Sequence, residues 1–170
     1  MPADDPISIA VCGPDPVPTA DVEREAEEIG RRIAEAGAVL VCGGLGGVMD
    51  AAARGCVRGS GMSIGILPSA TRTGASPALT YSVPTGIGEM RNALIVRAAD
   101  ALIAVSGGFG TLSEIAFALK TGVPVVGLRT WGLVRDGAPV EAFVRVDSPE
   151  EAVREALRLA RERRAEAGQA

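Results

Sequence analysis

Histidine is absent from this 170-residue chain, and aromatic residues make up only 3% of it. Without an imidazole, Ser-His-Asp and Cys-His nucleophilic catalysis, histidine general acid–base chemistry and histidine-ligated metals are excluded. Any chemistry must therefore use carboxylates, arginines, hydroxyls and backbone amides.

Paired cysteines are also lacking. Cys12, Cys42 and Cys56 are an odd number with no Cys-x-x-Cys spacing, so neither a disulfide framework nor a zinc site is predicted. Cys12 and Cys42 each end an apolar run, which favours small buried core residues over nucleophiles. We expect no metal and no required cofactor.

No apolar run reaches transmembrane length, and the acidic Ala3-Asp4-Asp5 is the opposite of a signal peptide. The net charge is −4, and no basic cluster precedes the C-terminal Arg161-Glu162-Arg163-Arg164. We therefore expect a cytoplasmic protein that binds neither membranes nor nucleic acid.

The chain is rich in aliphatic residues: its 47% hydrophobic content comes mainly from Ala, Val, Ile and Leu, as in parallel strands buried on both faces. Strand-like runs occur at 7–12, 39–42, 63–67, 101–105, 125–128 and 143–146. Helix-like segments alternate with them at 21–36, 48–58, 89–99, 112–121 and 149–167. This alternation predicts an α/β fold, a doubly wound, mostly parallel sheet flanked by helices (Rossmann-like).

The length predicts one Rossmann-like nucleotide-binding domain over residues 1–170, with 160–170 as a frayed, solvated end. Its most informative segment is Ser106–Glu114, which lies between an apolar run and a helix-like one. Glycines in such a loop expose backbone N–H groups at the start of a helix, where the dipole favours an anion. We expect a phosphate to bind at Gly107, Gly108, Phe109, Gly110 and Thr111.

The same loop disfavours two common ligands. It has no Gly-Lys-Ser/Thr ending for a nucleoside triphosphate, and no Gly-x-Gly-x-x-Gly spacing for a dinucleotide. A nucleoside 5′-monophosphate or a similar phosphorylated small molecule fits better.

Two more glycine-bearing turns follow strand-like runs. They contain Gly13 and the set Gly43, Gly44, Gly46 and Gly47. Because the carboxyl ends of parallel strands meet at one edge, we expect these glycines to join the ligand site. The alternative is steric, since glycine-rich turns end many strands without binding anything.

Glu114 and Arg91 are the candidate reactive side chains. Leu112, Ile115, Ala116 and Leu119 are expected to form the sheet-facing stripe of their helix, with Glu114 on the opposite side, facing the ligand. Arg91 falls in the first turn of a predicted helix, where a cation costs up to ~1 kcal/mol unless an anion binds. The alternatives are that Glu114 merely complements a helix dipole and that Arg91 pairs with Glu89.

Ser106–Glu114 resembles the Pro-Gly-Gly-x-Gly-Thr-x-x-Glu signature of the LONELY GUY (LOG) family of nucleotide phosphoribohydrolases. The likeness extends in order over residues 7–130, and molybdenum-cofactor carrier proteins share the fold. Its further segments are Val11–Gly13, Cys42–Met49, Met90–Asn92 and Arg97–Asp100. Ser106 replaces the signature proline, and Asn92 replaces a lysine.

The resemblance implies that Glu114 and Arg91 are a catalytic pair, that Asn92 contacts the ligand, and that the activity is cleavage of an N-glycosidic bond rather than lysine decarboxylation. A carboxylate can stabilise the oxocarbenium character of the sugar while it activates water. The alternative is a non-catalytic carrier or sensor of molybdenum cofactor or of a nucleotide. A third reading is an effector-binding subunit of a larger assembly.

The segment Ala93–Ala99 is apolar nearly all round, and Phe117 and Ala118 lie off the expected sheet-facing stripe. A helix with no polar face needs cover on two sides, and a sheet supplies only one. We therefore expect a homodimer or higher homo-oligomer built on these helices. The alternative cover is the C-terminal helix of the same chain. Arg97 and Asp100 are expected to be structural.

Overall fold

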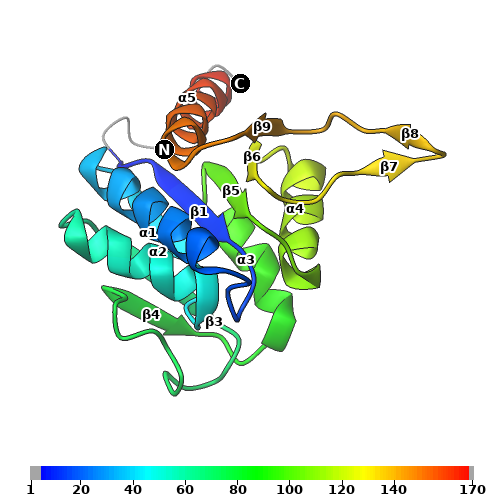
Figure 1. The fold of residues 1–170 in the computed structure, drawn as a ribbon. Helices are drawn as coiled ribbons and strands as arrows, with labels where there is room; N and C mark the ends of the chain where they lie inside the picture. The colour runs from blue at the N-terminus through cyan, green and yellow to red at the C-terminus, as the bar shows by residue number, and fades with distance from the viewer. Residues whose placement is uncertain (1–4, 169–170) are drawn as a thin grey trace.

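A computed structural model describes residues 5–168 and confirms the α/β prediction. Seven parallel strands form one sheet in the order β4-β3-β2-β1-β5-β6-β9 (Figure 1). They are β1 (Ser8–Cys12), β2 (Val39–Cys42), β3 (Ser63–Leu67), β4 (Tyr81–Pro84), β5 (Ala101–Val105), β6 (Val125–Leu128) and β9 (Val144–Val146). The helices are α1 (Ala20–Glu35), α2 (Gly47–Arg58), α3 (Asn92–Arg97), α4 (Phe109–Thr121) and α5 (Pro149–Ala167), with a 3₁₀ turn at Gly88–Arg91.

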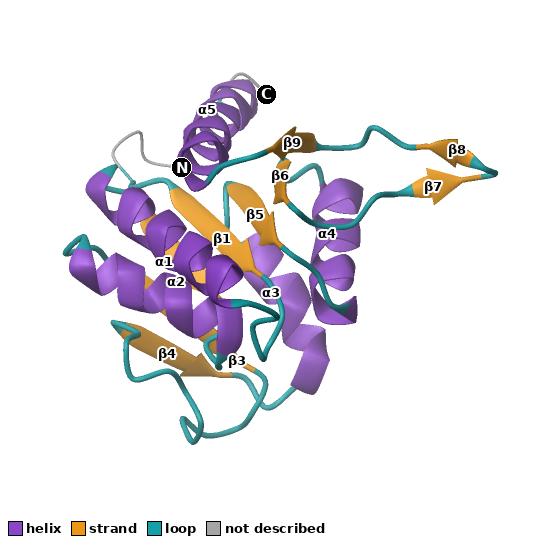
Figure 2. Cartoon of the chain, viewed as in Figure 1, coloured by secondary structure: helices purple, strands orange, loops and turns teal. Residues whose placement is uncertain are grey.

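Helices cover both faces of the sheet (Figure 2). On one face α1, α2 and α5 bury an aliphatic core that includes Ile9, Ile29 and Ala156. On the other face α3 and α4 bury a smaller core around Ile95, Leu102 and Ile115. The strands between the two layers are buried on both sides, which explains why they are continuously apolar in the sequence.

The structure has two strand pairings that the sequence did not predict. β4 pairs in parallel with β3 and ends the sheet, where Pro84 costs no ladder hydrogen bond on the free side. β7 (Val134–Arg135) and β8 (Ala138–Pro139) form a separate hairpin that projects from the body (Figure 1). These strands are short and exposed, so they carry little hydrophobic pattern.

The buried face of α4 differs from the expected one. Its buried residues are Thr111, Glu114, Ile115 and Ala118, whereas Ala116 and Phe117 are exposed. The buried stripe therefore lies one residue earlier in the sequence than expected. Ala118, which was expected to lie outside the buried stripe, belongs to it. The reason is that two of the buried residues are polar, so hydrophobic periodicity alone marks the wrong face.

The expectation of a frayed end is wrong for residues 160–167, which continue α5. Arg163 donates to the carbonyl of Ala99 (3.1 Å), and Arg164 forms an ion pair with Asp100 (2.6 Å). Asp100 is structural, as expected, although its partners are Arg164 and the Ser8 N–H (2.8 Å) rather than Arg97. Residues 169–170 of the predicted frayed segment lie outside the described residues.

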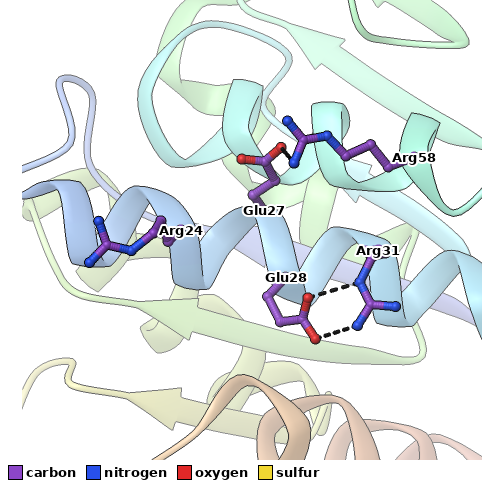
Figure 3. Close-up of a pocket in the computed structure, with 5 residues that line it drawn as sticks. All are labelled: Arg24, Glu27, Glu28, Arg31 and Arg58. Atoms are coloured by element: carbon purple, nitrogen blue, oxygen red, sulfur yellow. Dashed lines mark hydrogen bonds and ion pairs between the residues drawn. The ribbon is translucent and has the colours of Figure 1, made fainter.

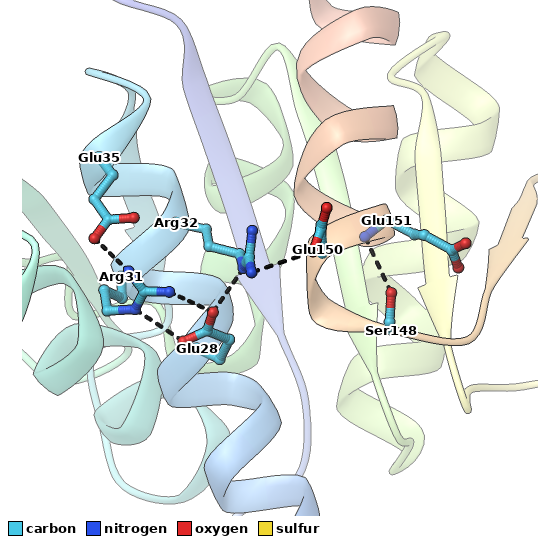
Figure 4. Close-up of polar contacts among 7 residues, drawn as sticks. All are labelled: Glu28, Arg31, Arg32, Glu35, Ser148, Glu150 and Glu151. Carbon is cyan, nitrogen blue, oxygen red and sulfur yellow. Dashed lines mark hydrogen bonds and ion pairs between the residues drawn. The ribbon is translucent and has the colours of Figure 1, made fainter.

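The other end of α5 is fixed to α1 (Figure 4). Ser148 is the N-cap, and its hydroxyl accepts a hydrogen bond from the Glu151 N–H (3.2 Å). Arg32 of α1 forms an ion pair with Glu150 (3.3 Å). α5 therefore packs on the α1 side of the sheet and does not cover α3, which removes the alternative of burial by the C-terminal helix.

Candidate functional site

The sheet has one topological switch point, between β1 and β5. The chain passes from β1 to β2 on one side, and later returns from β4 to β5 on the other side of β1. In open parallel sheets a crevice for ligands forms beyond the carboxyl ends of the strands at such a point. The loops after β1, β2 and β5, where the sequence places its glycines, therefore lie around the same edge.

Glu114 lies in this crevice from the second turn of α4 and is only 6% exposed. Burial raises the pKa of its carboxyl group from 4.5 to about 7, although the Arg91 charge and a hydrogen bond from the Cys12 thiol oppose the shift. A carboxyl group with such a pKa can hold or release a proton near neutral pH.

Arg91 comes from the end of the 3₁₀ turn that precedes α3 and is 8% exposed. Within residues 5–168 it has no carboxylate in ion-pair contact, and its Nε atom is buried without a hydrogen-bond partner. Burial lowers its pKa, and the negative charge of Glu114 is the main opposing influence. A buried guanidinium with unused donors is costly and is expected where an anionic ligand binds.

Gly43 makes room for this guanidinium. A Cβ atom built on Gly43 would lie 2.6 Å from Arg91 Nη2 and 2.5 Å from Met49 Sδ. The glycine therefore serves to seat Arg91 against the end of β2. Its separate role as a ligand contact stays a prediction.

The other upstream glycines are packed against protein atoms. A Cβ atom on Gly13 would lie 2.7 Å from the Val105 oxygen, and one on Gly44 would lie 2.7 Å from Leu67 Cδ2. A Cβ atom on Gly46 would lie 2.8 Å from a carboxylate oxygen of Asp15, and Gly47 adopts φ +62°. These positions need glycine for steric reasons, and their contact with a ligand is untested.

The N-terminus of α4 is open by contrast. Gly108 is its N-cap, and a Cβ atom on Gly108 or Gly110 would meet no atom within 4 Å. The Leu112 N–H donates to the Gly108 oxygen (3.0 Å), so the N–H groups of the three residues between them have no acceptor within the helix. The N-terminus of α4 therefore offers unpaired backbone N–H groups and the positive end of the helix dipole, a combination that favours binding of an anion.

Asn92 connects α3 with the first turn of α4. Its Nδ2 atom donates to Ser113 Oγ (2.9 Å), which donates to the Gly110 oxygen (2.7 Å). The amide therefore holds the glycine loop in place, a role for which the sequence gave no separate signal. Thr111 is 2% exposed and accepts a long hydrogen bond from the Gly108 N–H (3.5 Å), whereas Phe109 is 83% exposed.

Sequence reasoning missed two residues of this region. Cys12 is buried, as predicted, but it lies directly against Glu114, and the burial and this negative charge raise the pKa of its thiol. Trp131, beyond β6, donates from Nε1 to the Gly108 oxygen (3.1 Å). The available signal was composition, because Trp131 is the one tryptophan of the chain.

A surface pocket on α1 and α2 is a poor alternative site (Figure 3). Four of its five lining side chains are paired with one another, Arg31 with Glu28 (2.5 Å) and Arg58 with Glu27 (2.6 Å), and the fifth, Arg24, is paired with Asp21. In the part of the chain that the structure describes, no three acidic or cysteine side chains gather as a metal site, and no helix is long and apolar enough to span a membrane.

Two sequence relatives match a large part of this chain. An uncharacterised protein of Archaeoglobus fulgidus is 43% identical over 130 residues, which are 76% of this chain and 82% of that protein. A probable cytokinin riboside 5′-monophosphate phosphoribohydrolase of Oryza sativa subsp. japonica is 33% identical over 107 residues, or 61% of this chain. The match spans only 44% of the rice protein.

Two solved structures match nearly the whole chain. The molybdenum cofactor binding protein of Rippkaea orientalis has a TM-score of 0.84 and 32% identity, covering 92% of this chain and 99% of that one. The Moco carrier protein of Chlamydomonas reinhardtii has a TM-score of 0.80 and 30% identity, covering 93% and 99%. The model of the SLOG cluster4 family matches residues 6–153, and the chain belongs to that family.

Proposed function

We propose that this protein binds a nucleoside 5′-monophosphate and hydrolyses its N-glycosidic bond. The observation that carries the proposal is the buried pair of Arg91 and Glu114 beside the open N-terminus of α4. Arg91 keeps unused donors, and Glu114 has a pKa of about 7. Within residues 5–168 Arg91 has no carboxylate in ion-pair contact, and the hydrogen-bond partner of Glu114 is the neutral Cys12 thiol.

The phosphate would bind at the free N–H groups of the first turn of α4, and Arg91 would orient the phosphate or the ribose. The sugar would then lie within reach of Glu114 in the second turn of the same helix. In the reaction the bond between C1′ and the base nitrogen breaks, and a water oxygen bonds to C1′. The Glu114 carboxylate stabilises the developing oxocarbenium charge and takes a proton from the water, and that proton passes to the base, which leaves with the bonding electron pair.

The rice relative supports this reaction type, because it is a probable cytokinin riboside 5′-monophosphate phosphoribohydrolase. The chain spans less than half of that protein, so the base is not assigned by the match. The test is release of free base and ribose 5-phosphate from a panel of nucleoside monophosphates. Glu114→Gln is expected to reduce kcat by orders of magnitude with little change in nucleotide affinity, since the carboxylate acts in the transition state.

The pH profile of this reaction gives a second test. Because the mechanism needs the carboxylate form of Glu114, kcat/KM should rise with pH and level off above the pKa of about 7. A rate that is independent of pH between 5 and 8, or robust turnover by Glu114→Gln, would remove Glu114 from the mechanism.

A second candidate is carriage of molybdenum cofactor without turnover. The favouring observation is that the two solved proteins named for this cofactor match almost end to end. The open α4 N-terminus and Arg91 suit any phosphorylated ligand, so the site itself fits both functions. Tight binding of the cofactor together with no base release from any nucleotide would favour the carrier.

We also propose that the protein is a homodimer through α3 and α4. α5 lies on the other face of the sheet, and apolar side chains stay exposed on this one: Met90 75%, Leu94 42% and Phe117 43%. Such neighbouring apolar side chains are typical of a contact surface. Arg91 and Glu114 adjoin this surface in sequence, so the ligand site would lie near the subunit boundary.

A further inference from the structure

We propose that Trp131 is a positioning residue that fixes the glycine loop in its anion-binding shape and connects it to the β7–β8 hairpin. The inference rests on the proposed function of the loop, and the groups of the proposed reaction do not include Trp131. Of the chain's one tryptophan, one tyrosine and three phenylalanines, three gather here: Phe109, Trp131 and Phe143.

The indole contacts the loop at two consecutive residues. Its Nε1 atom donates to the Gly108 oxygen (3.1 Å). A Cβ atom on Gly107 would lie only 2.6 Å from the same nitrogen, so the ring lies directly against the Gly107 backbone. The preceding residue, Ser106, adopts φ +55°, a left-handed conformation that costs energy outside glycine. Tertiary contacts must therefore hold this turn.

These contacts decide where the loop directs its donors. In a trans peptide group the C=O and the N–H point in opposite directions. The Gly108 oxygen accepts from Trp131 on one side and from the Leu112 N–H (3.0 Å) on the other, which fixes the plane of the Gly108–Phe109 peptide. The Phe109 N–H is thereby directed out of the helix N-terminus, where the anion is expected.

Trp131 is itself held from the far side. Arg145 of β9 donates from Nη2 to the Trp131 oxygen (2.5 Å), and its guanidinium lies over the Phe143 ring (5.2 Å). The exposed Phe109 ring contacts the indole with a centroid distance of 5.8 Å. The residues between Trp131 and Phe143 form the projecting hairpin (Figure 1), so one end of the hairpin contacts the glycine loop directly and the other is connected to Trp131 through Arg145.

The experiment compares the parent protein with Trp131→Phe, which keeps a ring but removes the N–H donor. Tyr81→Phe, an aromatic change on β4, is the matched control. Without any ligand, amide hydrogen exchange of Leu112 should become about fivefold faster in Trp131→Phe, as expected for the loss of one hydrogen bond. The Ala104 amide of β5 reports whether the fold is intact.

The second readout is binding of adenosine monophosphate and of inorganic phosphate, which should weaken by about fivefold in Trp131→Phe and stay unchanged in Tyr81→Phe. Arg145→Gln should produce the same changes to a smaller extent, since it loosens Trp131 without touching the loop. Unchanged Leu112 exchange in a folded Trp131→Phe protein would overturn the inference, even if the parent binds nucleotide. Faster exchange in a protein whose parent binds no anion would support the positioning role and reject the proposed function.

Discussion

At the scale of single residues, the Glu114 carboxyl group has the pKa that matters most for the proposed site. Its pKa is about 7 in the folded protein, because burial disfavours the charged form, against 4.5 for an ordinary glutamate. Between pH 4.5 and about pH 7, therefore, Glu114 is mostly protonated in the folded protein and mostly ionised in the unfolded protein. A destabilised carboxylate of this kind is common where a ligand or a transition state uses the charge.

This shift predicts the pH dependence of stability. The free energy of unfolding should fall as the pH rises from 4.5 to about 7, by up to about 3 kcal/mol, because the folded state must release a proton that the unfolded state has already lost. Glu114→Gln has no such proton, so this part of the fall should be missing in urea titrations at pH 5, 6, 7 and 8. Parallel stability curves for the two proteins would contradict the buried, raised carboxyl group.

Gly43 and Arg91 make a second prediction at the residue scale. Gly43→Ala places a methyl group where the Arg91 guanidinium and the Met49 sulfur lie, and the flexible ends of both side chains can move without disturbing the backbone. Gly43→Ala should therefore weaken nucleotide binding or turnover about as much as Arg91→Ala does, with little change in stability.

The double variant tests the link between them. Gly43→Ala added to Arg91→Ala should have almost no further effect, because both changes remove the same guanidinium contact. Gly168→Ala, at the end of α5 where φ is −77° and a Cβ atom would make only ordinary contacts, serves as the control. Effects that simply add would show that Gly43 acts on the ligand itself.

At the scale of elements, we expect the phosphate of the ligand to bind at the first turn of α4. Gly108→Val is expected to abolish phosphate-ligand binding, because its side chain would fill the opening above the helix N-terminus. Gly108 has φ −121° and open space around its Cα, so the fold should tolerate the change. The measurement is calorimetric titration with adenosine monophosphate, together with circular dichroism. Binding that survives in a folded Gly108→Val protein would place the site elsewhere.

At the scale of the whole molecule, the exposed apolar face of α3 and α4 predicts assembly. The parent should have the light-scattering mass of two or more chains at micromolar concentration. Leu94→Glu, which puts a charge on this face, should shift the mass toward one chain, whereas Val134→Glu on the projecting hairpin should not. A single-chain mass for the folded parent would defeat the dimer.

Much of the fold follows from the sequence. The bounds of β2, β3, β5, β6 and α5 agree with the predicted segments. The strands could be found because parallel strands buried on both faces are continuously hydrophobic. The sequence also predicts the turn between β5 and α4, because Gly107, Gly108 and Gly110 lie between an apolar run and a helix-like segment, although α4 begins at Phe109 rather than at residue 112.

The tertiary structure alone decided which groups meet in the crevice. The buried face of α4 carries Thr111 and Glu114, which hydrophobic periodicity cannot identify as buried. Arg91 lies against Gly43, and Trp131 lies against Gly107, through contacts between residues far apart in the chain. Local sequence sets strands, caps and turns through short-range forces, whereas the choice of partners depends on the order of strands in the sheet, which brings separate loops to the same edge.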